Sequence, residues 1–399
     1  MSKPASDFLI IGAGIIGLTV AYQLRKRHPH ASITIIEKES DVARHSSGRN
    51  SGVLHAGFDY SSDSLKARFC VLGNGALKEY CRHKKLAINE CGKLVVAKNE
   101  EELEQLYELE RRAKRNGAPV TLLSEEDAQK IEPNVLTHKQ ALWSPSTATL
   151  DPTSLCATLR DDILSKNVTG LFSTRYLSAS QNTVNTTNGT LSAGKIINCA
   201  GLYADKVAHD FGFGRKYTII PFKGIYLKYK KNHTDLTTNI YPVPDLRNPF
   251  LGVHFTKTVD GAIKIGPTAI PVFWRENYGF KSGFQAAEAA SILYHEAILF
   301  LTNAFGFRDL AFEEVKKYCR TYLINLACKL VKNVDPAGFG DYTAPGIRAQ
   351  LLDRGTRELV QDFVVEGDQH SVHVLNAVSP ALTCSFPFSE WVVEKYIEA

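Results

Sequence analysis

The sequence predicts an α/β fold that opens on a strand, a glycine-rich turn, a helix and a second strand. Residues 8–11 form a continuous apolar run, which is typical of a strand buried on both faces. The pattern Gly-x-Gly-x-x-Gly follows at residues 12–17, and residues 18–24 show the apolar periodicity of a helix. A second apolar run at 33–36 ends in Glu37. This order indicates a Rossmann-like dinucleotide-binding domain.

Each part of this unit has a physical task in holding a dinucleotide. Gly12 makes the tight turn, Gly14 lets the backbone approach a pyrophosphate, and Gly17 lets the helix pack closely on the strand. The N–H groups and the positive dipole end of the helix N-terminus attract the phosphates. Glu37 can accept both ribose hydroxyls of the adenosine, and its charge argues against the 2′-phosphate of NADP.

Composition bounds the possible function. The 399 residues leave room for two domains but hardly for more. The hydrophobic share of 44% and the charged share of 22% are ordinary for a globular protein, so disorder is not expected. The formal net charge of +5 is small and the basic residues are scattered, which argues against a nucleic-acid partner. A mild positive balance suits an anionic substrate.

Cysteine spacing and the apolar runs predict the compartment. The eight cysteines lie far apart without a Cys-x-x-Cys pair, so we expect free, mostly buried thiols in a reducing cytoplasm and no metal site. Residues 1–7 are short and polar, unlike a secretory signal. The most apolar helical run, 292–305, contains Glu296 and is too short to span a bilayer. We expect a cytoplasmic protein that at most rests on the surface of the inner membrane.

The segment after the second strand favours FAD over NAD. Residues 46–57 form a polar loop of small residues with a short apolar centre. Such a loop lets the backbone lie against a flat ring and a diphosphate, which an NAD site does not need at this position. The alternative is an ordinary Gly/Ser loop.

Further motifs extend from this loop to the C-terminus. They are Asn50-Ser51-Gly52-Val53-Leu54-His55-Ala56-Gly57, Ser64-Leu65-Lys66-Ala67, Cys91-Gly92-Lys93-Leu94, Asp151-Pro152, Asn198-Cys199-Ala200-Gly201, Pro221-Phe222-Lys223-Gly224, Pro249-Phe250-Leu251-Gly252-Val253-His254, Gly266-Pro267, Gly346-Ile347-Arg348-Ala349-Gln350, and Asn376-Ala377 with Ser379-Pro380-Ala381. Together with the opening unit they resemble the D-amino-acid-oxidase-like superfamily of FAD enzymes and, within it, the L-2-hydroxyglutarate oxidases and dehydrogenases. The resemblance covers about the whole chain. It implies oxidation of L-2-hydroxyglutarate to 2-oxoglutarate by hydride transfer to FAD, with electrons passed to oxygen or to a membrane quinone.

Three positions depart from the family pattern. Arg49 stands where the family usually has His, Asp59 where it has an aromatic residue, and Val378 where it has Pro. These positions are close to the expected flavin loops, so they leave fine substrate choice and the electron acceptor open.

The resemblance implies a discontinuous, Rossmann-like FAD-binding domain and an α+β substrate-binding domain with an antiparallel sheet. We expect residues 1–89, 146–210 and 336–399 in the first domain, and residues 90–145 and 211–335 in the second. The cofactor-binding candidates are Gly12, Gly14, Ile15, Ile16, Gly17, Glu37, Lys38, Arg49, Asn50, Ser51, Gly52, Val53, Ala200, Gly201, Gly346, Ser379, Pro380 and Ala381.

Several elements can be predicted outside the opening unit. Strands are expected at 195–198 and 372–375, and a helix that begins near Ser379-Pro380 would direct its N–H groups at the flavin pyrimidine oxygen. The charge-rich helix 100–116 is expected to present a solvated face rather than a binding element. Strands at 253–255 and 262–265 flank an Asp260-Gly261 turn. Long helices are expected at 283–305 and 312–331.

Oxidation of a 2-hydroxy acid needs an anchor for the carboxylate, a base for the hydroxyl proton and a flavin that faces the C–H bond. Arg348 is the expected anchor, because a guanidinium matches a carboxylate bidentately and its position resembles the superfamily's Gly-x-Arg site. His55 is the first choice for the base, since the family motif implies that its loop lies beside the flavin. His254 is the rival, although its same-face neighbour Gly252 does not reveal which way it points.

A five-carbon diacid needs a second cation for its distal carboxylate. Lys223, Arg275 and Lys93 are candidates, and Lys223 is favoured because its segment matches the family.

Two other functions stay open. The first is an amine or imino-acid oxidase of the same superfamily, similar to glycine or sarcosine oxidase, which would share the carboxylate-binding Arg. The second is a flavin-bound binding module without turnover. The sequence does not fix the oligomeric state, the acceptor, or whether FAD is held covalently.

Overall fold

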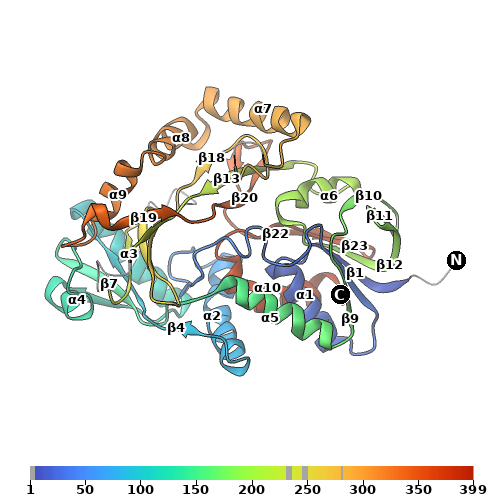
Figure 1. The fold of residues 1–399 in the computed structure, drawn as a ribbon, viewed down its shortest axis with the longest axis horizontal. Coiled ribbons are helices and arrows are strands. Elements are labelled where there is room, and N and C mark those ends of the chain that lie inside the picture. Colours follow the sequence, from blue (N-terminus) through green and yellow to red (C-terminus); the bar gives the residue numbers. More distant parts are fainter. Residues whose placement is uncertain (1–4, 231–235, 245–249, 280–281, 399) are drawn as a thin grey trace. The chain divides into compact units, whose positions relative to one another are not determined.

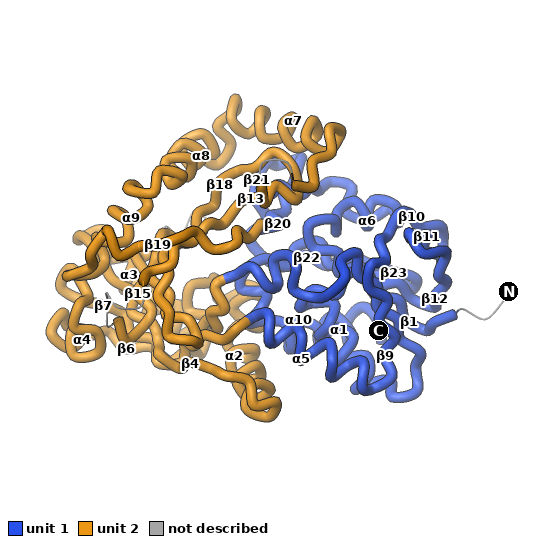
Figure 2. The backbone as a smooth tube through the Cα atoms, in the orientation of Figure 1, with its two compact units in different colours: residues 1–50, 152–221, 348–399 blue, residues 51–151, 222–347 orange. Residues whose placement is uncertain are grey.

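The computed structural model describes residues 5–230, 236–244, 250–279 and 282–398, which cluster into two compact units (Figure 2). Unit 1 consists of Met1–Asn50, Pro152–Pro221 and Arg348–Ala399, and unit 2 consists of Ser51–Asp151 and Phe222–Ile347. Each unit is therefore assembled from separate stretches of the chain. Residues 51–89, which we expect from the sequence in the FAD-binding domain, cluster with unit 2.

Unit 1 is built on a sheet whose parallel strands run in the order β23-β12-β1-β2-β9. Their bounds are Ser371–Asn376, Gly189–Asn198, Ser6–Ile11, Ile33–Ile36 and Val168–Leu171. The antiparallel strands β10 (Tyr176–Ser180), β11 (Thr183–Thr186) and β22 (Val364–Gly367) extend this sheet. Residues 8–11 pair with 195–198 on one side and with 33–36 on the other. These central strands are apolar runs because helices and loops cover both faces of a parallel sheet.

The helices of unit 1 include α1 (Ile15–Arg27), α5 (Pro152–Ser165), α6 (Ala204–Asp210) and α10 (Ala381–Tyr396). α1 packs against both α5 and α10 (Figure 1). The hydroxyls of Thr19 on α1 and Ser389 on α10 share a buried hydrogen bond of 2.7 Å. The helix that opens the chain and the helix that closes it therefore form one layer.

Unit 2 contains an eight-stranded sheet in the order β19-β14-β17-β16-β15-β5-β7-β6. The bounds in that order are Phe339–Tyr342, Leu227–Tyr229, Ile263–Gly266, His254–Lys257, Asn239–Pro242, Lys93–Val96, Gln140–Ser144 and Thr121–Ser124. Side chains alternate between the two faces of a sheet. Leu94, Ile240 and Phe255 share one face and join an apolar cluster with Leu323 and Ala327 of α9 (Arg320–Cys328). The neighbouring polar residues therefore lie on the opposite face.

Smaller elements complete the molecule. Unit 2 also holds a three-stranded sheet of β3 (Val53–Leu54), β8 (Ala148–Leu150) and β4 (Ile88–Asn89), and the helices α2 (Leu65–His83), α3 (Glu100–Asn116), α4 (Glu125–Ile131), α7 (Ala286–Thr302) and α8 (Phe307–Lys316). A four-stranded sheet runs in the order β18 (Ile270–Pro271), β13 (Tyr217–Gly224), β20 (Gly346–Asp353) and β21 (Glu358–Leu359). The chain passes between the units within β13 and β20.

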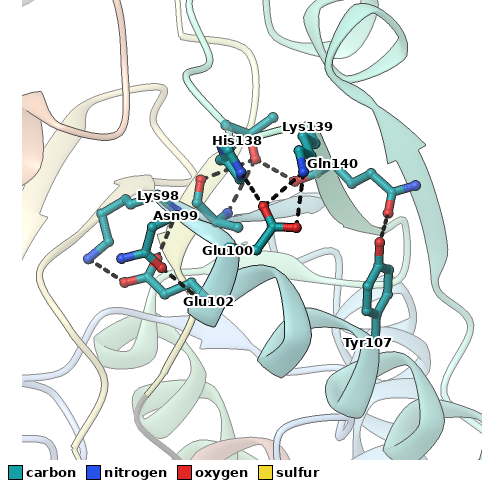
Figure 3. Close-up of polar contacts among 10 residues, drawn as sticks. Lys98, Asn99, Glu100, Glu102, Tyr107, His138, Lys139 and Gln140 are labelled. Atoms are coloured by element: carbon teal, nitrogen blue, oxygen red, sulfur yellow. Dashed lines mark hydrogen bonds and ion pairs between the residues drawn. The ribbon is translucent and has the colours of Figure 1, made fainter.

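The charged helix α3 begins and ends where the sequence predicts, and Figure 3 shows how its N-terminus is held. The Asn99 side chain caps the helix by accepting the N–H of Glu102 at 2.9 Å. Glu100 accepts hydrogen bonds from His138 and from Lys139, both at 2.8 Å. The polar face of α3 is thus engaged with its own chain and with solvent, while Leu103, Leu106 and Leu109 are buried.

The prediction of one long helix at 312–331 is wrong. Two helices stand there, because the N–H groups of Lys317, Tyr318 and Cys319 each bond a carbonyl three residues back and tighten the chain into a turn. No Gly or Pro marks this break, so the apolar pattern conceals it. α7 is also shorter than expected, since Asn303 adopts φ 47° and ends the helix.

Two further observations concern the cysteines and the helices. All eight cysteines are free, and most are buried, as predicted. None of the helices within the described residues combines the length and the apolar character that a membrane span requires.

Candidate functional site

The candidate cofactor segments of unit 1 all follow the carboxyl ends of neighbouring parallel strands. Gly12 follows β1, Glu37 follows β2, Cys199 follows β12 and Ala377 follows β23. Carboxyl ends of adjacent parallel strands meet at one edge of the sheet, which is where open α/β sheets bind their ligands. Segments far apart in the sequence therefore share one edge.

Close packing explains two of the glycines in the first turn. Gly12 adopts φ +100°, and a Cβ there would lie 2.6 Å from the carbonyl oxygen of Cys199. A Cβ on Gly17 would lie 1.9 Å from the carbonyl oxygen of Gly12. Neither position has room for a side chain, so the turn lies directly against both α1 and the segment after β12.

The N-terminus of α1 and the end of β2 bring donors and an acceptor together. Gly14 is the N-cap and provides no side-chain cap, while the Ile15 N–H donates to Ser47 Oγ at 2.9 Å. Glu37 Oε2 accepts the Ala13 N–H at 2.9 Å, so its carboxylate is held at the glycine turn. Helix N–H groups attract phosphate and a carboxylate accepts hydroxyls, which together suit a nucleotide.

The loop that follows is held by its own side chains. Asn50 Nδ2 donates to the carbonyl of Ser47 at 2.8 Å, and Arg49 Nε donates to the carbonyl of Arg44 at 2.7 Å. Lys38 Nζ lies 2.6 Å from Glu39 Oε1. Four of the cofactor-binding candidates belong to unit 2 instead: Ser51, Gly52, Val53 and Gly346.

Unit 2 gathers a second polar cluster on the face of its large sheet opposite the apolar core. Lys93 Nζ lies 3.5 Å from Asp59 Oδ2 and 4.7 Å from the ring centroid of Tyr241. The Tyr241 ring stacks on the imidazole of His254 with the centroids 3.6 Å apart. His55 is buried and lies close enough to both Lys93 and His254 to interact with them electrostatically. The structure therefore brings both candidate bases into one cluster.

Backbone contacts fix the position of His55. Its carbonyl accepts a hydrogen bond from Asn74 Nδ2 of α2 at 3.0 Å. A Cβ on Gly57, which adopts φ +92°, would lie 2.9 Å from Val71 of the same helix. The chain after β3 is thus pressed against α2, which explains the small residues beside His55.

The hydrogen bond of His254 defines its tautomer. Nδ1 lies 2.8 Å from the carbonyl oxygen of Gly252, and because a carbonyl only accepts, Nδ1 carries the hydrogen. The lone pair is therefore on Nε2, which is buried and bonds to no described residue. Burial lowers the pKa of His55 and of His254 to about 3 each, and the charge of Lys93 adds to the effect. Both imidazoles are uncharged at neutral pH.

The two candidate anchors have different surroundings. Arg348 on β20 is partly buried, and its Nε donates to Gln350 Oε1 at 2.9 Å. Gln350 is itself held by the Val360 carbonyl at 2.7 Å, so the guanidinium is oriented from the same face of the strand. Lys223 lies in unit 2 and lines a pocket of about 1000 Å³ together with aromatic residues such as Trp274 and Tyr278.

Lys223 differs in its ion pairing from the other two candidates for the cation that binds the distal carboxylate. Arg275 Nε lies 3.6 Å from Glu288 Oε2, and Lys93 is paired with Asp59, so a buried carboxylate already balances each charge. No described carboxylate lies within ion-pair distance of Lys223. Burial lowers the pKa of this lysine.

Comparison with known proteins identifies the family. A family model described as FAD dependent oxidoreductase matches residues 7–395. The chain belongs to the FAD-dependent oxidoreductases. Human mitochondrial L-2-hydroxyglutarate dehydrogenase is 35% identical over 99% of this chain and 89% of its own length. The L-2-hydroxyglutarate dehydrogenase of Escherichia coli K12 is 32% identical over 98% of this chain and 92% of its own length. The L-2-hydroxyglutarate dehydrogenase of Indibacter alkaliphilus is 33% identical over 97% of this chain and 99% of its own length.

Solved structures of this oxidoreductase fold confirm the predicted fold class. L-α-glycerophosphate oxidase of Mycoplasma pneumoniae, solved with FAD bound, superposes with a TM-score of 0.77 at 23% identity and covers 98% of this chain and 94% of its own. Glycine oxidase of Geobacillus kaustophilus superposes with a TM-score of 0.73 at 18% identity and covers 99% and 95% respectively.

The cofactor is FAD, and the edge of the unit 1 sheet fits it. The positions of Gly12 and Gly17 have no room for a Cβ, and a glycine-rich turn of this kind is typical of a site where backbone approaches a diphosphate. Glu37 is held at that turn by the Ala13 N–H, and a carboxylate is an acceptor that suits ribose hydroxyls. α10 begins at Ala381, directly after Ser379-Pro380, where the sequence predicts a helix N-terminus.

Sequence reasoning missed some members of these sites. The sequence indicates Ser47 only as part of a polar loop, although its hydroxyl accepts a hydrogen bond from the first turn of α1. The sequence pattern does not indicate that Tyr241 belongs to the site, because its contact with His254 arises only when β15 and β16 pair. Lys93 comes directly before the apolar run Leu94-Val95-Val96, and this position indicates that it is buried and needs a partner such as Asp59.

Proposed function

We propose that this protein oxidises L-2-hydroxyglutarate to 2-oxoglutarate with FAD. The observation that carries the proposal is the uncharged His254, whose Nε2 lone pair is directed away from its backbone contact and can accept the hydroxyl proton. Likeness to L-2-hydroxyglutarate dehydrogenases over almost the full chain supplies the substrate. Bound FAD supplies the oxidant that takes a hydride from the carbon bearing the hydroxyl.

The residues of the chain bind and orient the substrate and move its proton. We assign the C1 carboxylate to Arg348, because Gln350 orients its guanidinium. We assign the distal carboxylate to Lys223, whose charge no described carboxylate balances. His254 and His55 are the two candidates for the base, and the defined tautomer favours His254, whereas the sequence alone favours His55.

The flavin spectrum of the purified holoprotein tests this function. Under anaerobic conditions, L-2-hydroxyglutarate should bleach the flavin band at about 450 nm, and the D-isomer at equal concentration should not, because the cofactor's oxidation state reports hydride transfer. Glycine and sarcosine complete the panel. Bleaching by either amine and not by the hydroxy acid would move the assignment to an amine oxidase, and a flavin that no compound reduces would favour a binding module.

We further propose that the enzyme is cytoplasmic, that it contacts the inner membrane peripherally, and that its electrons pass to oxygen or to a membrane quinone. Most of the large apolar side chains that are exposed among the described residues fall between Phe273 and Tyr342: Phe273, Phe284, Leu293, Tyr294, Leu301, Phe305, Phe312, Val315, Tyr318 and Tyr342. α7 carries no Lys or Arg, and its only acids, Glu288 and Glu296, are buried. Exposed apolar surface of this kind is typical of a docking face.

A further inference from the structure

The Lys93–Asp59 ion pair is buried beside the two histidines and has no role in the assignments above. The Lys93 side chain is 0% exposed and that of Asp59 is 7% exposed, with Nζ and Oδ2 3.5 Å apart. An ion pair this deeply buried gains little stability over apolar residues of similar volume, since desolvation offsets the attraction. Its position therefore calls for an explanation other than stability.

Aromatic rings fix the ammonium group of Lys93. Nζ lies 4.3 Å from the ring centroid of Phe58 and 4.7 Å from that of Tyr241. Both distances are within the range of cation–π attraction. Tyr241 stands on β15, between β5, which carries Lys93, and β16, which carries His254. The Tyr241 ring thus contacts the ammonium and stacks on the imidazole of His254.

We propose that Lys93, held in place by Asp59, is a positioning residue whose charge adds to burial in disfavouring the protonated imidazoles of His55 and His254, so that they are available to accept the substrate proton. The inference rests on the proposed function, in which one of these imidazoles is the base. A fixed positive charge in a dry environment opposes a second positive charge nearby.

Other groups around His254 do not replace Lys93. His55 is uncharged, and Tyr241 is neutral because burial raises its pKa. Lys264 on β17 also opposes protonation of His254, but its effect on the pKa of His254 is smaller than that of Lys93. Burial lowers the pKa of Lys264 itself to about 8. Lys93 is the neighbouring charge that acts on both histidines.

The test uses the FAD-loaded protein and two readouts, the imidazole NMR signals of His55 and His254 and the pH profile of anaerobic flavin reduction. K93M removes the positive charge and leaves Asp59 negative, so the pKa of both imidazoles should rise by about 1–3 units. K93M/D59N removes both charges and should give a smaller rise. Because the base must be deprotonated, the acid limb of the reduction rate, which follows an imidazole pKa of about 3 in the wild type, should lie about 1–3 pH units higher in K93M.

The double variant R275M/E288Q is the matched control, since Arg275 and Glu288 form an equally buried ion pair in unit 2, 3.6 Å apart. It should leave the imidazole titrations unchanged. Identical titrations in wild type, K93M and K93M/D59N would overturn the proposal, and so would an equal shift in the control. K93M/D59N keeps the test available if K93M does not fold. If L-2-hydroxyglutarate does not reduce the flavin of the wild type, the proposed function is refuted. The imidazole titrations can still be measured by NMR in that case, because they need no turnover, and they test the effect of Lys93 on their own.

Discussion

At the scale of single residues, the side chains proposed to act are oriented by neighbours that do not themselves react. The Gly252 carbonyl sets the tautomer of His254, and Tyr241 sets the plane of its ring. Gln350, anchored on the Val360 carbonyl, sets the direction of Arg348. Such supporting contacts hold reacting groups close to a productive geometry, so they matter to rate as much as the reacting groups do.

Substitution of Arg348 should separate substrate binding from cofactor binding. R348K keeps the charge but loses the bidentate fork, and R348A loses both, so KM for the hydroxy acid should rise in that order while FAD content stays constant. Loss of a hydrogen bond to a charged group costs about 1.5–3 kcal/mol, which is roughly a 10- to 150-fold rise in KM for R348A. R160K, at an Arg of unit 1 that pairs with Asp41, serves as the control. Unchanged KM in R348A would remove the anchor role.

The two histidines can be ranked by single-turnover flavin reduction. Loss of a general base slows the step that it serves by about 10²–10⁴-fold. We expect H254Q to show this loss and H55Q to be affected less, because Nε2 of His254 has the lone pair of a defined tautomer. The opposite order would assign the base to His55, and near-normal reduction in both variants would exclude an imidazole base.

At the scale of elements, the cofactor edge depends on how closely α1 approaches the turn before it. A Cβ on Gly17 would lie 1.9 Å from the Gly12 carbonyl oxygen, which is backbone that cannot swing away. Gly75 in α2 is also a helical glycine, but it has room for a side chain, because a Cβ there would meet nothing within 4 Å.

These two glycines make a matched pair of variants. G17A should push α1 from the turn and weaken FAD binding, since an extra methyl in a packed contact costs about 1–3 kcal/mol, or about one to two factors of ten in affinity. G75A should retain full FAD and be neutral or slightly stabilising, because Ala favours a helix over Gly. The ratio of flavin to protein absorbance and the unfolding temperature measure both. Equal FAD content in G17A and wild type would contradict the account of the turn.

At the scale of the whole molecule, exposed apolar side chains are concentrated in one stretch of the chain that includes α7 and α8. Burial raises the pKa of Glu296 to about 8, so this acid of α7 is largely uncharged at neutral pH. Glu288 is balanced by Arg275. The helix therefore brings almost no net charge to a membrane surface, where burying a charge would be costly.

Vesicle sedimentation measures the proposed membrane contact. The holoprotein should sediment with phosphatidylethanolamine/phosphatidylglycerol vesicles, and L293S/L301S should sediment less, because each exposed leucine contributes apolar area to the contact. L72S/L177S replaces two leucines that are similarly exposed elsewhere and should bind as wild type does. Equal sedimentation of all three proteins would count against a contact through α7. Anaerobic reoxidation of the reduced enzyme by vesicles with and without ubiquinone then distinguishes quinone from oxygen as acceptor.

The sequence by itself determined the opening strand, turn, helix and strand, the acid Glu37, the bounds of α3 and the family. Those features depend on local patterns of apolar residues, glycine and charge, which neighbouring residues in the chain satisfy. Only the tertiary structure decided which way His254 points, that Lys93 and Arg275 are already paired, and that the chain turns between α8 and α9. The reason is physical: these depend on strand register and on contacts between distant segments, and a local pattern does not encode either.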